Sequence, residues 1–186
     1  MSLDAAGTSA GSPDRAALTV RAAEPSEWSA IGELSVDGYV AGGLIPAGHP
    51  YSASLRDTAH RARRAIVLVA VDADGTLLGS VTFCRPPSPL AELARPGESE
   101  FRMLAVAPVH HGRGAGEALV RSCIDRARDV GDSAVVLSTL DVTAAARRLY
   151  LRLGFERTPE RDWQPTPDIW LRAYRLELFG RCPSDA

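Results

Sequence analysis

The sequence predicts a single α/β domain in which about four helices flank a mixed β-sheet. Apolar runs of strand length recur along the chain, as at Ile66–Val71 and Ala134–Leu140. The turn sequence Asp72–Gly75 joins the first of these runs to another apolar run, as in a β-hairpin. Farther along, a glycine-rich loop opens into an amphipathic helical pattern that ends near Val130.

Length, composition and charge exclude several classes of protein. The chain has 186 residues, 45% of them hydrophobic, which suits one buried core. A formal net charge of −2 gives no general attraction to nucleic acid or to an acidic membrane. No apolar run reaches membrane-spanning length, and no basic segment followed by an apolar one opens the chain. We therefore expect a cytoplasmic protein that binds neither nucleic acid nor membrane.

The first part of the chain predicts a leader followed by alternating elements. Residues 1–16 are rich in small and polar residues without periodicity, which predicts a disordered leader. In order, we then expect a strand at Leu18–Ala22, a helix at about 25–40 that begins at Pro25, a loop at 42–50, and a polar helix at about 52–64.

The central and final parts predict further strands around two amphipathic helices. The expected elements are strands at 66–71, 77–84, 100–106, 134–140, 155–158 and 170–178, helices after Gly116 and before Gly154, a proline-rich loop at 85–98 and a polar loop at 160–168. The domain would span residues 17–180, with a flexible tail at 181–186.

Cysteine, histidine and lysine usage limits the chemistry. Cys84 and Cys123 lie in apolar patterns and are expected to be buried, and Cys182 leaves the count odd, so no disulfide framework is implied. The histidines show no metal-ligand spacing, so no metal site is expected. The chain contains no lysine, which excludes a Schiff-base lysine and a phosphate-loop lysine.

The segment from Phe101 to Val120 predicts an anion-binding loop. Gly112, Gly114 and Gly116 permit positive φ and close approach of the backbone to a ligand. The following helix start adds unpaired N–H groups, and Arg113 adds a cation. A Walker loop is excluded because no Gly-Lys-Ser/Thr sequence is present, and a Rossmann fingerprint is disfavoured because Glu117 occupies its third glycine position.

Two motifs give the chain, from Ala65 to Thr158, a resemblance to the GCN5-related N-acetyltransferase (GNAT) superfamily. The first is the triplet Leu104, Ala105, Val106 followed by the loop His111, Gly112, Arg113, Gly114, Ala115, Gly116, which resembles the family's acyl-CoA loop. The second is Thr143-x-x-Ala146-x-x-Leu149-Tyr150-x-x-x-Gly154-Phe155. His111 stands where the family has Arg or Gln, and Thr143 where it has Asn.

The resemblance implies a mostly antiparallel sheet with a V-shaped split between two parallel central strands, and acetyl-CoA as co-substrate without a metal. The strand edge at Leu104 and Val106 would bind the pantetheine, the amides of residues 111–116 would hold the diphosphate, and Thr143 would contact the pantetheine region. By the same resemblance Tyr150 would donate to the departing thiolate, although its place on an apolar helix face is equally typical of a core residue.

The resemblance also implies a position for the general base. Glu100 matches the position of the glutamate base in histone-type members, and Arg102 would share its strand face. A solvated strand-edge carboxylate is the alternative interpretation of Glu100. Glu33 and Asp37 on the first helix are lesser candidates, and His110 and His111 are assigned to the loop.

The implied function is N-acetyl transfer from acetyl-CoA to a primary amine of a small molecule or peptide, by direct transfer in a ternary complex. Acceptor specificity is expected from Tyr39–Tyr51, the 85–98 loop and the 160–169 segment with Trp163. A catalytically silent acyl-CoA-binding sensor is the alternative. A homodimer is compatible with either function.

Overall fold

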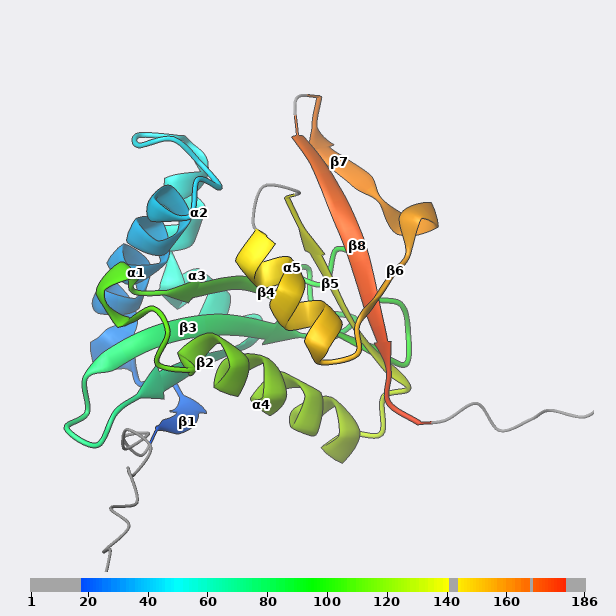
Figure 1. Cartoon of the computed structure of the whole chain (residues 1–186), viewed down its shortest axis with the longest axis horizontal. Helices are drawn as coiled ribbons and strands as arrows, with labels where there is room; N and C mark the ends of the chain where they lie inside the picture. Colours follow the sequence, from blue (N-terminus) through cyan, green and yellow to red (C-terminus); the bar gives the residue numbers. More distant parts are fainter. Residues whose placement is uncertain (1–17, 141–143, 168, 180–186) are drawn as a thin grey trace, which may run out of the picture.

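A computed structural model describes residues 18–140, 144–167 and 169–179 of the chain. Its strands form one open sheet, in which β7 pairs with β8 beside the main strand order β1-β2-β3-β4-β5-β8-β6 (Figure 1). β4 and β5 are parallel, and the other neighbouring strands are antiparallel. The strands are β1 Thr19–Ala22, β2 Ile66–Val71, β3 Leu77–Cys84, β4 Glu98–Val106, β5 Ala134–Thr139, β6 Glu156–Arg157, β7 Trp163–Thr166 and β8 Ile169–Glu177.

The helices cover both faces of this sheet. They are α1 Trp28–Ala41, α2 Tyr51–Arg56, α3 Thr58–Ala62, α4 Ala115–Asp129 and α5 Ala144–Arg152, with 3₁₀ turns at Pro25–Glu27, Pro108–His110 and Pro159–Arg161. Strand β2 is covered on both faces. On one face Leu68 and Ala70 pack in the cluster that contains α4. On the other face Val67, Val69 and Val71 pack with Ile31 of α1. Because side chains alternate along a strand, a strand covered on both sides has a continuous apolar sequence.

Two expectations about elements were wrong. The helix expected at 52–64 is two helices, because Asp57 adopts φ −76° and ψ 63° and its carboxylate accepts a hydrogen bond from the amide of His60. Asp57 therefore caps α3, and the described part of the chain has five α-helices, in agreement with the expected number of about four. The polar loop expected at 160–168 contains β7, which pairs with β8 through Trp163 and Thr166.

The sheet divides where β4 and β5 separate. The two strands pair in parallel only from Glu98 to Glu100, opposite Ala134 to Val136. Beyond Glu100, β4 continues for six residues beside α1 and β3, and β5 continues along β8. A β-bulge lies in the diverging part of β4, where Met103 has φ +53°. Such a bulge bends the strand, which contributes to the separation.

The structure also shows the surroundings of two cysteines and the character of the helices. Cys84 and Cys123 are both buried without a disulfide, and burial raises the pKa of both thiols. Among the helices that the structure describes, none is long and apolar enough to cross a membrane.

Candidate active site

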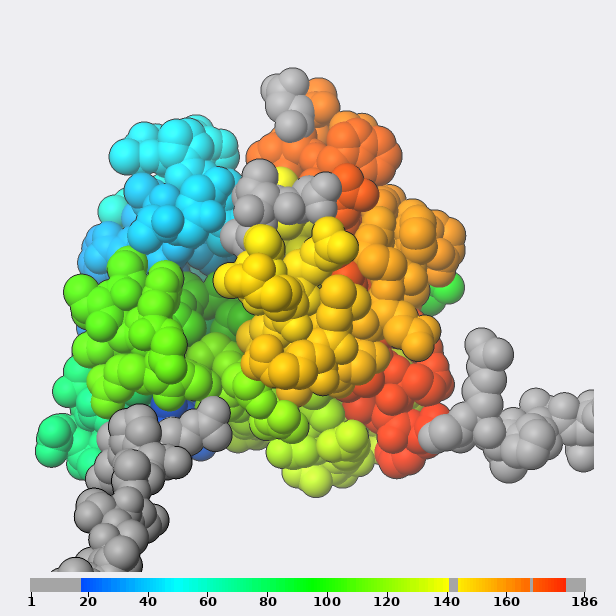
Figure 2. Space-filling model, viewed as in Figure 1, coloured from blue at the N-terminus to red at the C-terminus, as the bar shows by residue number. Residues whose placement is uncertain are grey.

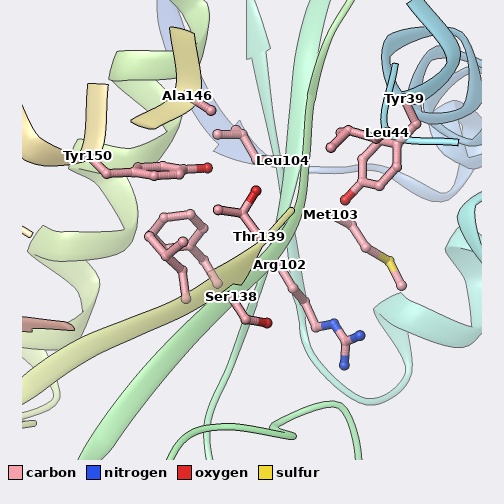
Figure 3. A pocket seen from close by; sticks show the side chains of 11 residues that line it. Tyr39, Leu44, Arg102, Met103, Leu104, Ser138, Thr139, Ala146 and Tyr150 are labelled. Atoms are coloured by element: carbon pink, nitrogen blue, oxygen red, sulfur yellow. The ribbon is translucent and has the colours of Figure 1, made fainter. Parts of the chain in front are cut away.

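A cavity of about 90 Å³ occupies the split between β4 and β5. Its walls come from both strands, from α1 and from α5 (Figure 3). On the molecular surface, the hollow lies between the α1–α2 side of the molecule and α5 (Figure 2). The lining residues are Tyr39, Leu44, Phe101, Arg102, Met103, Leu104, Leu137, Ser138, Thr139, Ala146 and Tyr150.

Tyr150 is held by an aromatic cluster while its hydroxyl faces this cavity. Its ring centroid lies 5.9 Å from that of Phe101, 6.0 Å from that of Phe155 and 6.1 Å from that of Tyr174. The hydroxyl points toward Leu104 and Thr139 (Figure 3) and has no hydrogen-bond partner among the described residues. Burial raises the pKa of Tyr150, so the phenol stays protonated near neutral pH. A fixed, protonated and unpartnered hydroxyl can donate to a group that enters the split.

The glycine loop before α4 presents free backbone amides. Gly112 and Gly114 have φ of +81° and +87°, and Gly114 forms the N-terminal cap of α4. The amides of His111 and Arg113 donate within the loop, to the carbonyls of Pro108 and His110. In the described structure no partner accepts from the amides of residue 112 or residues 114–117. The sequence predicted that all six amides of residues 111–116 hold the diphosphate. Two of them already donate within the loop, so four of the six remain available to a ligand.

This loop lies beside both β4 and α5. A Cβ on Gly116 would lie 3.5 Å from Val106 Cγ2 and 3.9 Å from Leu149 Cδ2. The unpartnered amides are therefore at the end of the split, beside Leu149, which precedes Tyr150 in α5. Free N–H groups at a helix start, with the positive end of the helix dipole, favour an anion.

The side chains of the loop contribute less than expected. Arg113 lies 3.1 Å from Asp72 of the β2–β3 turn, so its charge is already paired. The ring Nε2 of His111 lies 3.2 Å from the Val106 carbonyl and ties the loop back to β4. The Ala115 side chain is buried in the core. The loop therefore offers an anion mainly backbone groups.

The three residues of the β4 triplet have different surroundings. Leu104 lines the cavity, and Ala105 is buried against α1, where a Cβ on Gly38 would lie 3.2 Å from Ala105 Cβ. Val106 presents a carbonyl that already contacts His111. Because β4 does not pair with β5 beyond Glu100, its edge at Leu104 is open to a hydrogen-bonding ligand.

The structure does not support Glu100 as a base at the cavity. Its side chain is 2% exposed and lines neither this cavity nor the second one described below. The carboxylate accepts hydrogen bonds from the amides of Leu93 and Ala94, at 2.8 and 3.0 Å. Burial raises its pKa despite these bonds. Through these contacts Glu100 anchors the 85–97 loop to β4. Its burial also excludes the alternative interpretation of Glu100 as a solvated carboxylate at the strand edge.

The other candidate residues lie outside the cavity or outside the described chain. Glu33 forms an exposed ion pair with Arg56 at 2.8 Å, and Asp37 is exposed on α1. Trp163 lines neither cavity. Thr143, expected to contact the pantetheine region, lies outside the described residues.

A second cavity, of about 360 Å³, adjoins the first and shares Arg102 and Met103 with it. It is lined by Tyr51, Ala53, Ser54, Asp57, His60 and Arg61 from α2 and α3, and by Leu90, Glu92, Arg102 and Met103. Tyr51 and two residues of the 85–98 loop, Leu90 and Glu92, therefore line a cavity, and their role in acceptor binding stays a prediction. Arg61 was missed from the sequence, where it is one of several arginines on a polar helix and nothing marks it as buried.

Comparison with protein families identifies related sequences. The model of the Acetyltransferase (GNAT) family matches residues 28–155. An uncharacterised N-acetyltransferase of Schizosaccharomyces pombe is 36% identical over 104 residues, which is 56% of this chain. The match spans 60% of the length of that relative.

Comparison with solved structures identifies the same fold. A GCN5-related N-acetyltransferase from Kribbella flavida is 28% identical, with a TM-score of 0.64 over 90% of this chain and 100% of its own. The yncA protein of Salmonella typhimurium, solved with its cofactor acetyl-CoA, is 24% identical, with a TM-score of 0.63 over 91% of this chain and 99% of its own.

Proposed function

Because this chain belongs to the acetyltransferase (GNAT) family, we propose that it transfers an acetyl group from acetyl-CoA to the primary amine of a small molecule or peptide. The transfer would be direct, within a ternary complex. The observation that carries the proposal is the split between β4 and β5, with the unpartnered Tyr150 hydroxyl inside it and unpartnered amides at its end.

The chain has the groups that acetyl-CoA binding requires. Unpartnered amides at residue 112 and residues 114–117 suit a diphosphate. The space beside Gly112 and Gly114 is open, because no atom lies within 4 Å of a Cβ added at either residue. The open edge of β4 at Leu104 suits the amide groups of pantetheine. Each hydrogen bond to a charged acceptor contributes roughly 1.5–3 kcal/mol, so a few amides suffice for micromolar binding.

Acetyl-CoA, when bound, supplies an activated acetyl thioester. Tyr150 would donate a hydrogen bond to the departing sulfur as the thiolate leaves. Because the raised pKa of Tyr150 makes the phenol a weak acid, we assign it stabilisation of the thiolate rather than early proton transfer. As the new C–N bond forms and the C–S bond breaks, the attacking nitrogen loses a proton, which neutralises the CoA thiolate.

Before the attack, the acceptor ammonium must lose a different proton, and we assign its removal to the second cavity. An alkyl ammonium with a pKa near 10.4 must become neutral, at a cost of about 4–5 kcal/mol at pH 7. No carboxylate lines the first cavity within the described residues, whereas Glu92 lines the second and lies 2.8 Å from Arg102, which lines both. We propose that the proton leaves through water in the second cavity toward Glu92.

Thermal unfolding in the presence of CoA, NAD and NADP tests the cofactor first. A ligand at 100 times its dissociation constant adds about 2.7 kcal/mol of stability, so CoA is expected to raise the Tm, with no comparable effect of either dinucleotide. Release of CoA thiol above the hydrolysis rate, measured over a panel of amines, then tests transfer. Tight CoA binding without turnover on any amine would favour the acyl-CoA sensor.

A further inference from the structure

The second cavity contains a buried cation without a counter-ion. Arg61 of α3 is 1% exposed and lines this cavity. Its guanidinium donates to Thr82 Oγ1 at 3.1 Å, to the Leu55 carbonyl at 2.9 Å and to Thr58 Oγ1 at 2.9 Å. All three acceptors are neutral, and no carboxylate of the described residues forms an ion pair with Arg61. Burial lowers its pKa, as expected for an uncompensated charge.

Two arginines that line this cavity each have a nitrogen without a partner. The Nε–H groups of Arg61 and Arg102 are both buried, and neither donates to an acceptor in the described structure. Arg102 is already paired with Glu92 and with the Leu90 carbonyl, and its side chain is 16% exposed. A buried donor without an acceptor is costly, and an unpaired buried charge is more so. An anion in the cavity would supply the negative charge that Arg61 lacks.

A single carboxylate suits this lining better than a dianion. Arg102 is paired with Glu92, so the charge left to attract an anion is that of Arg61, whereas Glu92 and the exposed cap residue Asp57 would repel a second negative charge. Planar guanidinium groups match a carboxylate with paired hydrogen bonds. Because Arg102 lines both cavities, a carboxylate held there lies next to the split in which Tyr150 stands.

We propose that the second cavity binds the carboxylate of the acceptor, so that the acceptor is an amino acid or a similar aminocarboxylate. This inference rests on the proposed acetyl transfer and adds the class of amine. The amine would lie in the split at Leu104 and Tyr150, and the carboxylate would lie against Arg102 and Arg61.

The test compares amino acids with their carboxamides, which keep the amine and remove the negative charge. Each pair is titrated calorimetrically into the CoA-loaded protein. At least one amino acid is expected to bind roughly 10- to 100-fold more tightly than its carboxamide, the range expected for hydrogen bonds to a charged group. Phosphoethanolamine is included and is expected to bind more weakly than that amino acid.

Variants assign the preference to the arginines. Arg102→Gln and Arg61→Gln are each expected to reduce the ratio of acid to carboxamide affinity about tenfold or more. Arg128→Gln, on the exposed end of α4, is the matched control and should keep the ratio. If Arg61→Gln does not fold, because Arg61 also joins α2 and α3 to β3, the Arg102→Gln result decides.

The outcomes are distinct from those for the proposed function. Equal binding of acids and carboxamides, no binding of any amino acid, preference for the phosphate, or a preference that survives in the folded arginine variants would each overturn the inference. Acetylation of carboxamides as readily as acids would leave the acetyltransferase intact and remove the carboxylate site. Acid-selective binding without any thiol release would keep the site and reject the acetyltransferase.

Discussion

At the scale of single residues, Tyr150 has a ring that packs in the core and a hydroxyl that faces the proposed site. Its ring packs against Phe101, Phe155 and Tyr174, which is the core role that its apolar helix face predicts. Its hydroxyl nevertheless faces the split without a partner among the described residues. Loss of the ring would therefore disturb packing, whereas loss of the hydroxyl alone would test chemistry.

Tyr150→Phe is expected to lower kcat about 10- to 100-fold, because the thiolate loses its donor while the aromatic packing remains. CoA affinity and Tm should change little. Steady-state kinetics and calorimetry on the same preparation measure both. Tyr174→Phe, in the same cluster but outside the cavity lining, is the control and should retain kcat. Unchanged kcat in Tyr150→Phe would assign this tyrosine to the core alone.

Glu100→Gln is expected to keep kcat within about threefold, since its carboxylate contacts loop amides and no cavity. The raised pKa of Glu100 also sets a pH dependence. A raised folded pKa favours the protonated form, so wild-type stability relative to the Gln variant should increase as pH falls from 7 through the folded pKa. Urea unfolding at pH 7 and pH 5 measures this. A large loss of kcat would restore Glu100 as the base.

At the scale of elements, the junction of the glycine loop with α4 determines the diphosphate site. The helix start leaves its first amides free, as every helix does, and the amide of residue 112 in the loop before it also has no partner in the described structure. Backbone conformation therefore matters more here than the identity of the side chains, including the substituted His111.

Gly114→Ala is expected to lose about 1 kcal/mol of stability, because a left-handed backbone disfavours a Cβ. It should also weaken CoA binding several-fold, since the Cβ would enter the space beside the free amides. Gly131→Ala is the matched control: Gly131 has φ +75° after α4 and, like Gly114, has no atom within 4 Å of an added Cβ. It should lose similar stability without loss of CoA affinity. Equal CoA binding by both variants would move the diphosphate elsewhere.

At the scale of the whole molecule, a buried ion network joins the two halves of the sheet below the split. Glu98, at the start of β4, accepts hydrogen bonds from Arg161 at 3.0 and 2.9 Å and from Arg175 of β8 at 3.1 Å. Burial opposes ionisation of Glu98, but the hydrogen bonds from Arg161 and neighbouring donors hold its pKa below the usual range. The halves are thus joined where β4 and β5 pair and separate above it.

Glu98→Gln is expected to cost about 3–5 kcal/mol at pH 7, because it leaves the buried Arg161 without its carboxylate. Glu117→Gln, which removes a partly exposed carboxylate with two more exposed arginine partners, should cost about 0–1 kcal/mol. Since the folded pKa of Glu98 is lowered, its stabilisation should fall as pH drops below about 4.5. Denaturant unfolding at pH 7 and pH 3.5 provides the measurement.

Much of the fold could be predicted from the sequence, and the acceptor side could not. Strand β2 was found because a strand covered on both faces is a continuous apolar run, and the helix α4 was found because its apolar residues recur with a period of 3.6. The glycine loop was found because positive φ needs particular residues. The environments of Glu100, Arg61 and Arg102 depend on elements distant in the sequence, so their patterns indicated exposure or left it open. The short strand β7 was missed because its pairing with β8 overrides a polar, proline-containing sequence.

Burial of Cys84 and Cys123 has a practical consequence for measuring turnover. A chromogenic disulfide reagent such as dithionitrobenzoate reacts with thiolates, and both of these side chains are shielded and held protonated. In the native state neither should consume the reagent on the timescale of an assay, so colour from these two positions should develop only after denaturation.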